Sequence, residues 1–283
     1  AQVWLKAENL LPSGAYKYRG AMNKITSLIE RYGKELRIVT ASSGNHGMAC
    51  ALAARNLGVQ ANVVVPVSTP QVKKDSIRAL GANLVEVGAT YDESFVSACE
   101  LAEKEHLYYV HPTSDRYTVG GQGTISLEIL DQCPQVEQIV VPIGGGGLIT
   151  GIALTMKTLK PSVKIYGVMP VGSAVYVESR RQGQLVTLDH CSSMADAVVR
   201  KTGEEYLYPY IEKYVDDIFT VTEDSIRQAV RTACLYGKLT LEGSGALALA
   251  ALLEKKCPLS PGTVLICSGG NIDKAVLDLC MQA

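Results

Sequence analysis

Four segments of the chain carry residue types that do chemistry, and the clearest is a run of glycines. The run consists of Gly144, Gly145, Gly146 and Gly147. It follows an apolar stretch, Gln138 to Pro142, and leads into another that begins at Leu148. Glycine N–H groups can approach and surround a phosphate. The loop lacks the Lys-Ser/Thr of a P-loop and the spacing of a dinucleotide fingerprint. We expect a phosphate site of another kind, with a flexible loop as the alternative.

A second segment places small polar residues between a strand and a helix. It reads Thr40, Ala41, Ser42, Ser43, Gly44, Asn45, His46 and Gly47. The N–H groups and the dipole at a helix start favour an anion. A carboxylate would suit this position, while the alternative is an ordinary helix cap.

Two further segments are weaker on their own. Ser268 follows the apolar run Thr263 to Cys267 and precedes two glycines, a pattern also typical of a tight turn. Lys17 lies in the stretch Leu11 to Ala21, and a lone lysine is usually a solvated surface residue. Nothing in the spacing around Lys17 by itself indicates catalysis.

The elements that must position these residues alternate along the chain. Strands are predicted at 38–40, 61–65, 84–87, 138–142, 164–168 and 263–267. Helices are predicted at 47–57, 71–80, 91–105, 148–159, 225–236 and 244–253. This alternation indicates an α/β protein with parallel sheets covered by helices. Such sheets bind ligands at the carboxyl ends of their strands, which is where three of the four segments fall.

Composition limits the classes of function. The 283 residues are 47% apolar and carry a net charge of −1, so no nucleic-acid or membrane-surface partner is indicated. No apolar run is long enough to span a bilayer, and the first residues do not resemble a signal peptide. The eight scattered cysteines are typical of reduced thiols in a cytoplasmic protein, and the four histidines form no zinc pattern.

Taken together and in this order, the four segments resemble the PLP-dependent threonine/serine dehydratase and serine racemase family. The lysine segment, Gly14 to Ala21, is similar to the family's Gly-Ser-Phe-Lys-x-Arg-Gly-Ala, and the similarity covers essentially the whole chain. The resemblance implies the tryptophan-synthase-β fold (fold type II), with two domains, each a mostly parallel twisted sheet covered by helices, and the active-site cleft between them. We expect a large PLP-binding domain at 1–39 plus 116–283, and a small domain at 40–115.

The resemblance also implies the site residues of a pyridoxal 5′-phosphate (PLP) enzyme. Lys17 would bind PLP through a Schiff base and then carry a proton. The remaining cofactor contacts would come from Asn45 at the ring hydroxyl, Ser268 at the ring nitrogen, and Gly144, Gly145, Gly146, Gly147 and Leu148 at the phosphate. The substrate carboxylate would be received by Ser42, Ser43, Gly44 and His46.

Departures from the family pattern refine the expected function. Met169 stands where racemases have a glutamate that binds a divalent cation, so we expect no metal there. Ser43 would return a proton in the racemase branch, or only bind the carboxylate. We expect an L-threonine/L-serine ammonia-lyase, with a serine or aspartate racemase or a 3-hydroxyaspartate dehydratase as the alternative. A PLP carrier without catalysis is a further alternative. The expected partner is a small amino acid, and relatives suggest a homo-oligomer.

Overall fold

The computed structural model describes residues 2–282 and divides the chain into two compact units. One unit contains residues 2–16 and 122–282, and the other contains Lys17–Gly121. The boundary therefore falls on the peptide bond before Lys17 and again inside a helix. Each unit has its own sheet and its own buried core, and each is described separately.

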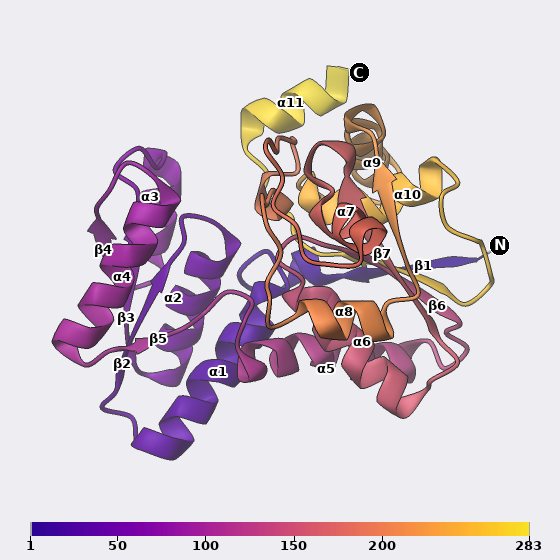
Figure 1. Cartoon of the computed structure of the whole chain (residues 1–283). Helices are drawn as coiled ribbons and strands as arrows, with labels where there is room; N and C mark the ends of the chain where they lie inside the picture. The colour runs from indigo at the N-terminus through magenta and orange to yellow at the C-terminus, as the bar shows by residue number, and fades with distance from the viewer. Residues whose placement is uncertain (1, 283) are drawn as a thin grey trace. The chain divides into compact units, whose positions relative to one another are not determined.

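The larger unit is built on a five-stranded sheet in which all neighbouring strands are parallel (Figure 1). In spatial order the strands are β1 (Val3–Ala7), β9 (Thr263–Cys267), β6 (Gln138–Pro142), β7 (Lys164–Pro170) and β8 (Asp217–Val221). The central strands β6 and β9 are buried along their whole length. Their unbroken apolar sequences are typical of parallel strands covered on both faces.

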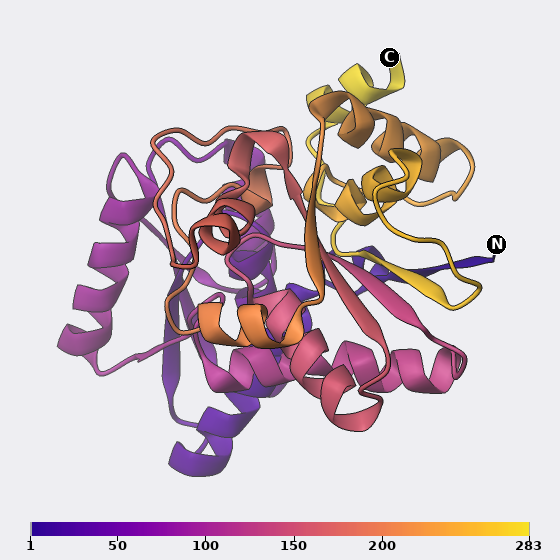
Figure 2. The ribbon, with the colours of Figure 1, turned by 45° about the vertical axis from the view of Figure 1, so that its right-hand side comes forward.

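Helices cover both faces of this sheet. They are α5 (Arg116–Gln132), α6 (Gly147–Leu159), α7 (Val175–Gln182), α8 (Tyr208–Tyr214), α9 (Glu223–Leu235), α10 (Leu247–Leu253) and α11 (Lys274–Gln282). Figures 1 and 2 show α5 and α6 next to each other on one face, and α9 and α10 on the other. Helices α9 and α10 share a buried core with strands β7 and β9.

The smaller unit has a four-stranded sheet that is also fully parallel. In spatial order the strands are β4 (Asn83–Glu86), β3 (Gln60–Val65), β2 (Arg37–Ala41) and β5 (Tyr108–Tyr109). The helices are α1 (Lys17–Tyr32), α2 (Asn45–Leu57), α3 (Gln71–Ala79) and α4 (Tyr91–Glu105). One core lies under α1, α2 and α3, and a smaller one lies under α4.

Local sequence signals explain where several of these helices begin and end. Thr90 caps α4 by accepting a hydrogen bond from the Glu93 N–H, and Gly58 ends α2 in the left-handed conformation. The predicted helix at 244–253 is interrupted, because Ser244–Ala246 form a 3-10 turn before α10. The predicted strands and the α/β class are confirmed, with ends that move by one or two residues.

The division into units differs from the expected domain boundaries. Residues 17–39 were expected with the larger domain, but α1 packs against α2 and shares its core through Ala21 and Ile25. Strand β2 likewise belongs to the smaller sheet. Among residues 2–282, no helix is both long and apolar enough to cross a membrane.

Candidate active site

Lys17 is the first residue of α1, and its amine has a defined partner within the smaller unit. Its Nζ donates a hydrogen bond to the carbonyl oxygen of Pro112, at 2.8 Å. The side chain is half-buried, unlike the solvated lysine that its spacing alone would suggest. The position of this amine therefore depends on the segment that carries Pro112.

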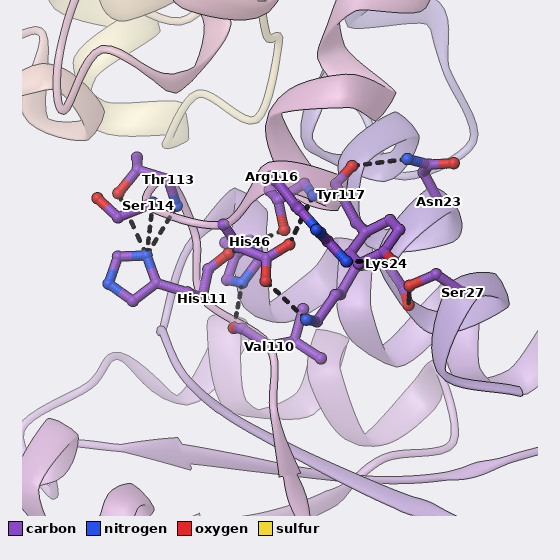
Figure 3. Close-up of polar contacts among 12 residues, drawn as sticks. Asn23, Lys24, Ser27, His46, Val110, His111, Thr113, Ser114, Arg116 and Tyr117 are labelled. Atoms are coloured by element: carbon purple, nitrogen blue, oxygen red, sulfur yellow. Dashed lines mark hydrogen bonds and ion pairs between the residues drawn. The ribbon is translucent and has the colours of Figure 1, made fainter. Parts of the chain in front are cut away.

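That segment, Val110–Asp115, follows the short strand β5 and is fixed by several hydrogen bonds (Figure 3). His111 Nδ1 accepts hydrogen bonds from the N–H of Thr113 and, at 2.7 Å, from the N–H of Ser114. Asp115 Oδ1 accepts from two N–H groups at the start of α5, and its Oδ2 lies 2.6 Å from Lys24 Nζ. These bonds give the Pro112 carbonyl a definite orientation.

His46 is bound to the same segment. Its Nε2 lies 2.9 Å from the carbonyl oxygen of Val110 (Figure 3). A carbonyl can only accept a hydrogen bond, so Nε2 carries a hydrogen and is the donor. Burial lowers the pKa of His46 to about 3, helped by the positive charge of Lys17. The imidazole is therefore neutral near pH 7. Its only N–H is used within the protein, which leaves the backbone N–H of His46 as the group to receive a carboxylate.

The start of α2 retains the geometry of an anion site. The first intrahelical bond runs from the Met48 N–H to the Gly44 carbonyl, so earlier N–H groups have no acceptor within the helix. Ser42 Oγ accepts from the Gly44 N–H, and a Cβ on Gly47 would lie 2.1 Å from the Ser42 carbonyl oxygen. The loop is thus pinned to the helix. Ser43, at its centre, is half-buried.

Asn45 is the first residue of α2, one position before His46. Its place at the helix start, in the same unit as Lys17, is consistent with the expected contact to the cofactor ring. The smaller unit therefore contains six of the predicted site residues, which are Lys17, Ser42, Ser43, Gly44, Asn45 and His46.

The larger unit contains the glycine loop, between β6 and α6. Gly146 has φ +96°, a conformation that side chains disfavour, and a Cβ there would lie 2.7 Å from Ile211 Cδ1. Tyr176 Oη donates to the Gly145 carbonyl at 3.0 Å, so the loop is held in place. The N–H groups of the first turn, including that of Leu148, have no acceptor within the helix. This arrangement is a typical phosphate site.

Ser268 lies in the same unit, at the carboxyl end of β9, and is buried. Its Oγ is 3.4 Å from the Ser244 carbonyl, and its own carbonyl accepts from the Tyr16 N–H. Ala15 pairs with Gly269 in an isolated bridge. The chain segment leading into Lys17 is thus attached to the segment of Ser268 within the larger unit. Burial raises the pKa of Tyr16 far above its usual range, so its phenol stays protonated.

Sequence reasoning missed the Val110–Asp115 segment. Its strand, β5, has only two residues, and its role depends on long-range bonds to Lys17, His46 and Lys24. One signal was available: His111-Pro112 follows a strand end, the same position that marked the other loops.

The residues present fit PLP. A glycine-rich helix start suits its phosphate, a buried hydroxyl suits a neutral ring nitrogen, and a half-buried amine suits its aldehyde. The left-handed Gly146 packs closely against Ile211 and Tyr176, where a Cβ would not fit, and this packing holds the glycine loop in its shape. Among residues 2–282, no group of three His, Cys, Asp or Glu side chains could hold a metal ion.

The parallel sheets and these two helix-start sites define an α/β enzyme that holds a phosphorylated cofactor. A family model described as pyridoxal-phosphate dependent enzyme matches residues 1–269. The chain belongs to this family, and its cofactor is PLP.

Individual relatives agree with the resemblance seen in the motifs. The chain is 37% identical to the L-threonine ammonia-lyase of Thermotoga maritima, over 98% of this chain and 69% of that protein. It is 39% identical to the serine racemase of Rattus norvegicus, over 99% and 86%. The processed form of threonine deaminase isoform 2 from Solanum lycopersicum matches with a TM-score of 0.93 and 36% identity, over 99% of this chain and 82% of that one. The predicted family and fold are thereby confirmed.

Proposed function

We propose that this protein is an ammonia-lyase that eliminates water from L-threonine or L-serine, after which hydrolysis of the resulting imine consumes one water and releases ammonia, giving a 2-oxo acid. The observation that carries the proposal is the amine of Lys17, held on the Pro112 carbonyl in the same unit as the anion site at the start of α2. The relatives named L-threonine ammonia-lyase support this reaction.

Bound PLP supplies an electron sink for the charge that develops at the substrate's α-carbon. In our proposal Lys17 holds the cofactor covalently, and its released amine takes the α-proton. The Pro112 carbonyl orients that amine, because a carbonyl accepts a hydrogen bond from it at 2.8 Å. Gly144 to Gly147 and the N–H of Leu148 bind the phosphate, which fixes the position of the cofactor.

The substrate carboxylate binds at the start of α2. The backbone N–H groups of the first turn and the hydroxyls of Ser42 and Ser43 supply the hydrogen bonds, and the helix dipole favours the negative charge. His46 contributes its backbone N–H while its neutral ring stays on Val110. Asn45 contacts the cofactor ring from the same turn.

Ser268 would be the partner of the ring nitrogen. A serine hydroxyl is uncharged, so it does not stabilise a protonated ring nitrogen as a carboxylate would. A neutral partner of this kind would favour loss of the β-hydroxyl over amino-group transfer. The burial of Ser268 keeps water from competing for this contact.

Racemisation of serine, or of aspartate, is the second candidate function. Ser43 favours it, because a half-buried hydroxyl at the helix start could return a proton to the α-carbon. The similarity to rat serine racemase, 39% identity, supports this activity as well. Dehydration of 3-hydroxyaspartate would use the same residues.

The test is incubation of the PLP-loaded protein with L-serine, L-threonine and L-threo-3-hydroxyaspartate, with 2-oxo acid and D-amino acid both measured. We expect 2-oxo acid from L-threonine or L-serine as the main product. D-amino acid that disappears in Ser43→Ala, while 2-oxo acid remains, would assign racemisation to Ser43. Absence of both products from all three substrates would contradict the proposal and leave a carrier of PLP.

We also propose that the protein acts in the cytoplasm as a homo-oligomer. All eight cysteines, which lie within the described residues 2–282, are outside disulfide bonds, and this supports a reducing compartment. Sedimentation of the PLP-loaded protein would test the assembly, and a mass equal to one chain at micromolar concentration would contradict it.

A further inference from the structure

Tyr176, in α7, is a buried tyrosine whose hydroxyl is bonded to the glycine loop. Its Oη donates a hydrogen bond to the Gly145 carbonyl at 3.0 Å and accepts one from the Glu204 N–H at 2.9 Å. A backbone N–H can only donate, and a hydroxyl has one hydrogen, so that hydrogen is committed to the Gly145 carbonyl. Burial raises the pKa of Tyr176 above its usual range, which keeps this hydrogen in place near neutral pH.

The bond to Tyr176 fixes the orientation of the peptide that joins Gly145 and Gly146. A trans peptide is planar, so its C=O and its N–H point in opposite directions. Because the Gly145 carbonyl points at Tyr176, the Gly146 N–H points away from Tyr176. No backbone carbonyl of residues 2–282 accepts a hydrogen bond from the Gly146 N–H. The lock therefore leaves this N–H directed away from the buried tyrosine and available to a ligand.

A lock of this kind matters because both residues of the peptide are glycines. Glycine adopts left-handed and right-handed conformations almost equally well, so this peptide could turn over at little cost. The turned peptide would present the Gly145 oxygen in place of the Gly146 N–H, and a carbonyl oxygen repels an anion that successive N–H groups would attract. A Cβ on Gly146 would lie 3.0 Å from Tyr176 Oη, so the glycine and the tyrosine are fitted to each other.

We propose that Tyr176 is a positioning residue for the phosphate of PLP, because its hydroxyl holds the Gly145–Gly146 peptide with the N–H directed at the phosphate. This inference rests on the proposed phosphate site at Gly144 to Leu148. Tyr176 does not touch the cofactor, since it lies on the carbonyl side of the peptide. Without the hydroxyl the peptide populates both orientations, and the site loses one of its N–H donors in part of the molecules.

The experiment compares the binding of PLP and of pyridoxal, which lacks the phosphate, to the apoprotein by fluorescence titration. In Tyr176→Phe the dissociation constant for PLP should rise roughly fivefold, because one hydrogen bond no longer orders the loop. The constant for pyridoxal should stay within about twofold of the wild-type value. Inorganic phosphate, used as a competitor of PLP, should also bind the variant more weakly than it binds the wild type.

Tyr208→Phe is the matched control. The ring of Tyr208 stacks on that of Tyr176, with centroids 6.4 Å apart, and its Oη donates to the Ser179 carbonyl at 3.3 Å. This variant loses a comparable hydroxyl beside the same ring, but no bond to the glycine loop. Its dissociation constants for PLP and for phosphate should stay within about twofold of the wild-type values.

The ratio of the two affinities separates a phosphate effect from a general loss of structure. Equal weakening of PLP and pyridoxal in Tyr176→Phe, or no change in either, would overturn the positioning role of Tyr176. The same loss of PLP affinity in Tyr208→Phe would overturn it as well. Wild-type protein that binds PLP no better than pyridoxal would instead contradict the phosphate site at the glycine loop, so the two failures are distinguishable.

Discussion

The amine of Lys17 and the carbonyl of Pro112 are joined by a hydrogen bond of 2.8 Å, although 95 positions separate the two residues in sequence. Pro112 belongs to the segment Val110–Asp115, which also holds the ring of His46. A single loop thus orients the proposed catalytic amine and holds His46 at the start of α2, the helix that we propose receives the substrate carboxylate. Changes in this loop should alter catalysis without touching the substrate.

The first prediction concerns Asp115→Ala. Burial would raise the pKa of Asp115, but hydrogen bonds from Lys24 and from the N–H groups of Thr118 and Tyr117 hold it below its usual range. Loss of this cap should lower the free energy of unfolding by about 1–2 kcal/mol, measured by urea titration. It should also lower kcat more than it raises KM, since the loop orients Lys17.

Asp75→Ala is the control for that variant. Asp75 pairs with Arg78 at an exposed position of α3, where an ion pair contributes about 0.5 kcal/mol or less. Its kinetics should match those of the wild type. An Asp115→Ala protein with unchanged kcat would show that the loop does not orient the amine.

The second prediction concerns acid stability. Burial, and then the charge of Lys17, lower the pKa of His46 to about 3 in the folded protein, against about 6.5 for an unfolded chain. Between these values the unfolded state binds more protons, so stability falls as pH falls from 6.5. The slope from this residue reaches at most about 1.4 kcal/mol per pH unit.

Urea unfolding midpoints measured between pH 5 and 7 give this pH dependence of stability. Most carboxylates titrate below this range, so they contribute little to the slope. His46→Gln should flatten the profile, whereas His190→Gln, at an exposed position, should not. A profile with the same slope in His46→Gln and the wild type would show that the buried imidazole is not the source.

Much of the site could be read from sequence because its signals are local. The glycines at 144–147 and the polar run at 42–46 stand beside strongly apolar strands, and both lie at helix starts as expected. The direction of the His46 side chain could not be read in this way. It turns onto Val110 because a carbonyl 64 positions away accepts a hydrogen bond from its Nε2–H, and only tertiary structure brings that carbonyl there.

The sequence pattern also gave no sign of the boundary between the two units at Lys17. Helix α1 begins at Lys17, and the helix has a polar average composition, so no apolar run marks it. Its few buried residues, such as Ala21 and Ile25, pack against α2, and this assigns the helix to the smaller unit. Domain membership depended on packing between helices rather than on composition.

The third prediction separates a binding role of the glycine loop from simple backbone strain. Gly146 and Gly183 both adopt left-handed conformations, with φ +96° and +69°. Alanine at Gly183 should cost about 1–2 kcal/mol of stability. Alanine at Gly146 should cost more, because its Cβ would also lie 2.7 Å from Ile211 Cδ1. Only Gly146→Ala should also weaken PLP binding, by roughly tenfold or more, because its Cβ would disturb the N–H groups that surround the phosphate.

Fluorescence titration of the apoproteins with PLP would compare the two variants. Gly183 ends α7, and a Cβ there meets no atom within 4 Å, so its variant reports strain alone. Equal PLP affinities for Gly146→Ala and Gly183→Ala would remove the support for a phosphate site at the loop.

The central claim is that Lys17 holds PLP covalently, and chemical trapping tests it most directly. The PLP-loaded protein would be reduced with borohydride, digested and analysed by mass spectrometry. A stable pyridoxyl label should appear on the peptide containing Lys17 and be absent from Lys17→Ala. Label on a different lysine of the wild-type protein, or no label at all, would contradict the account.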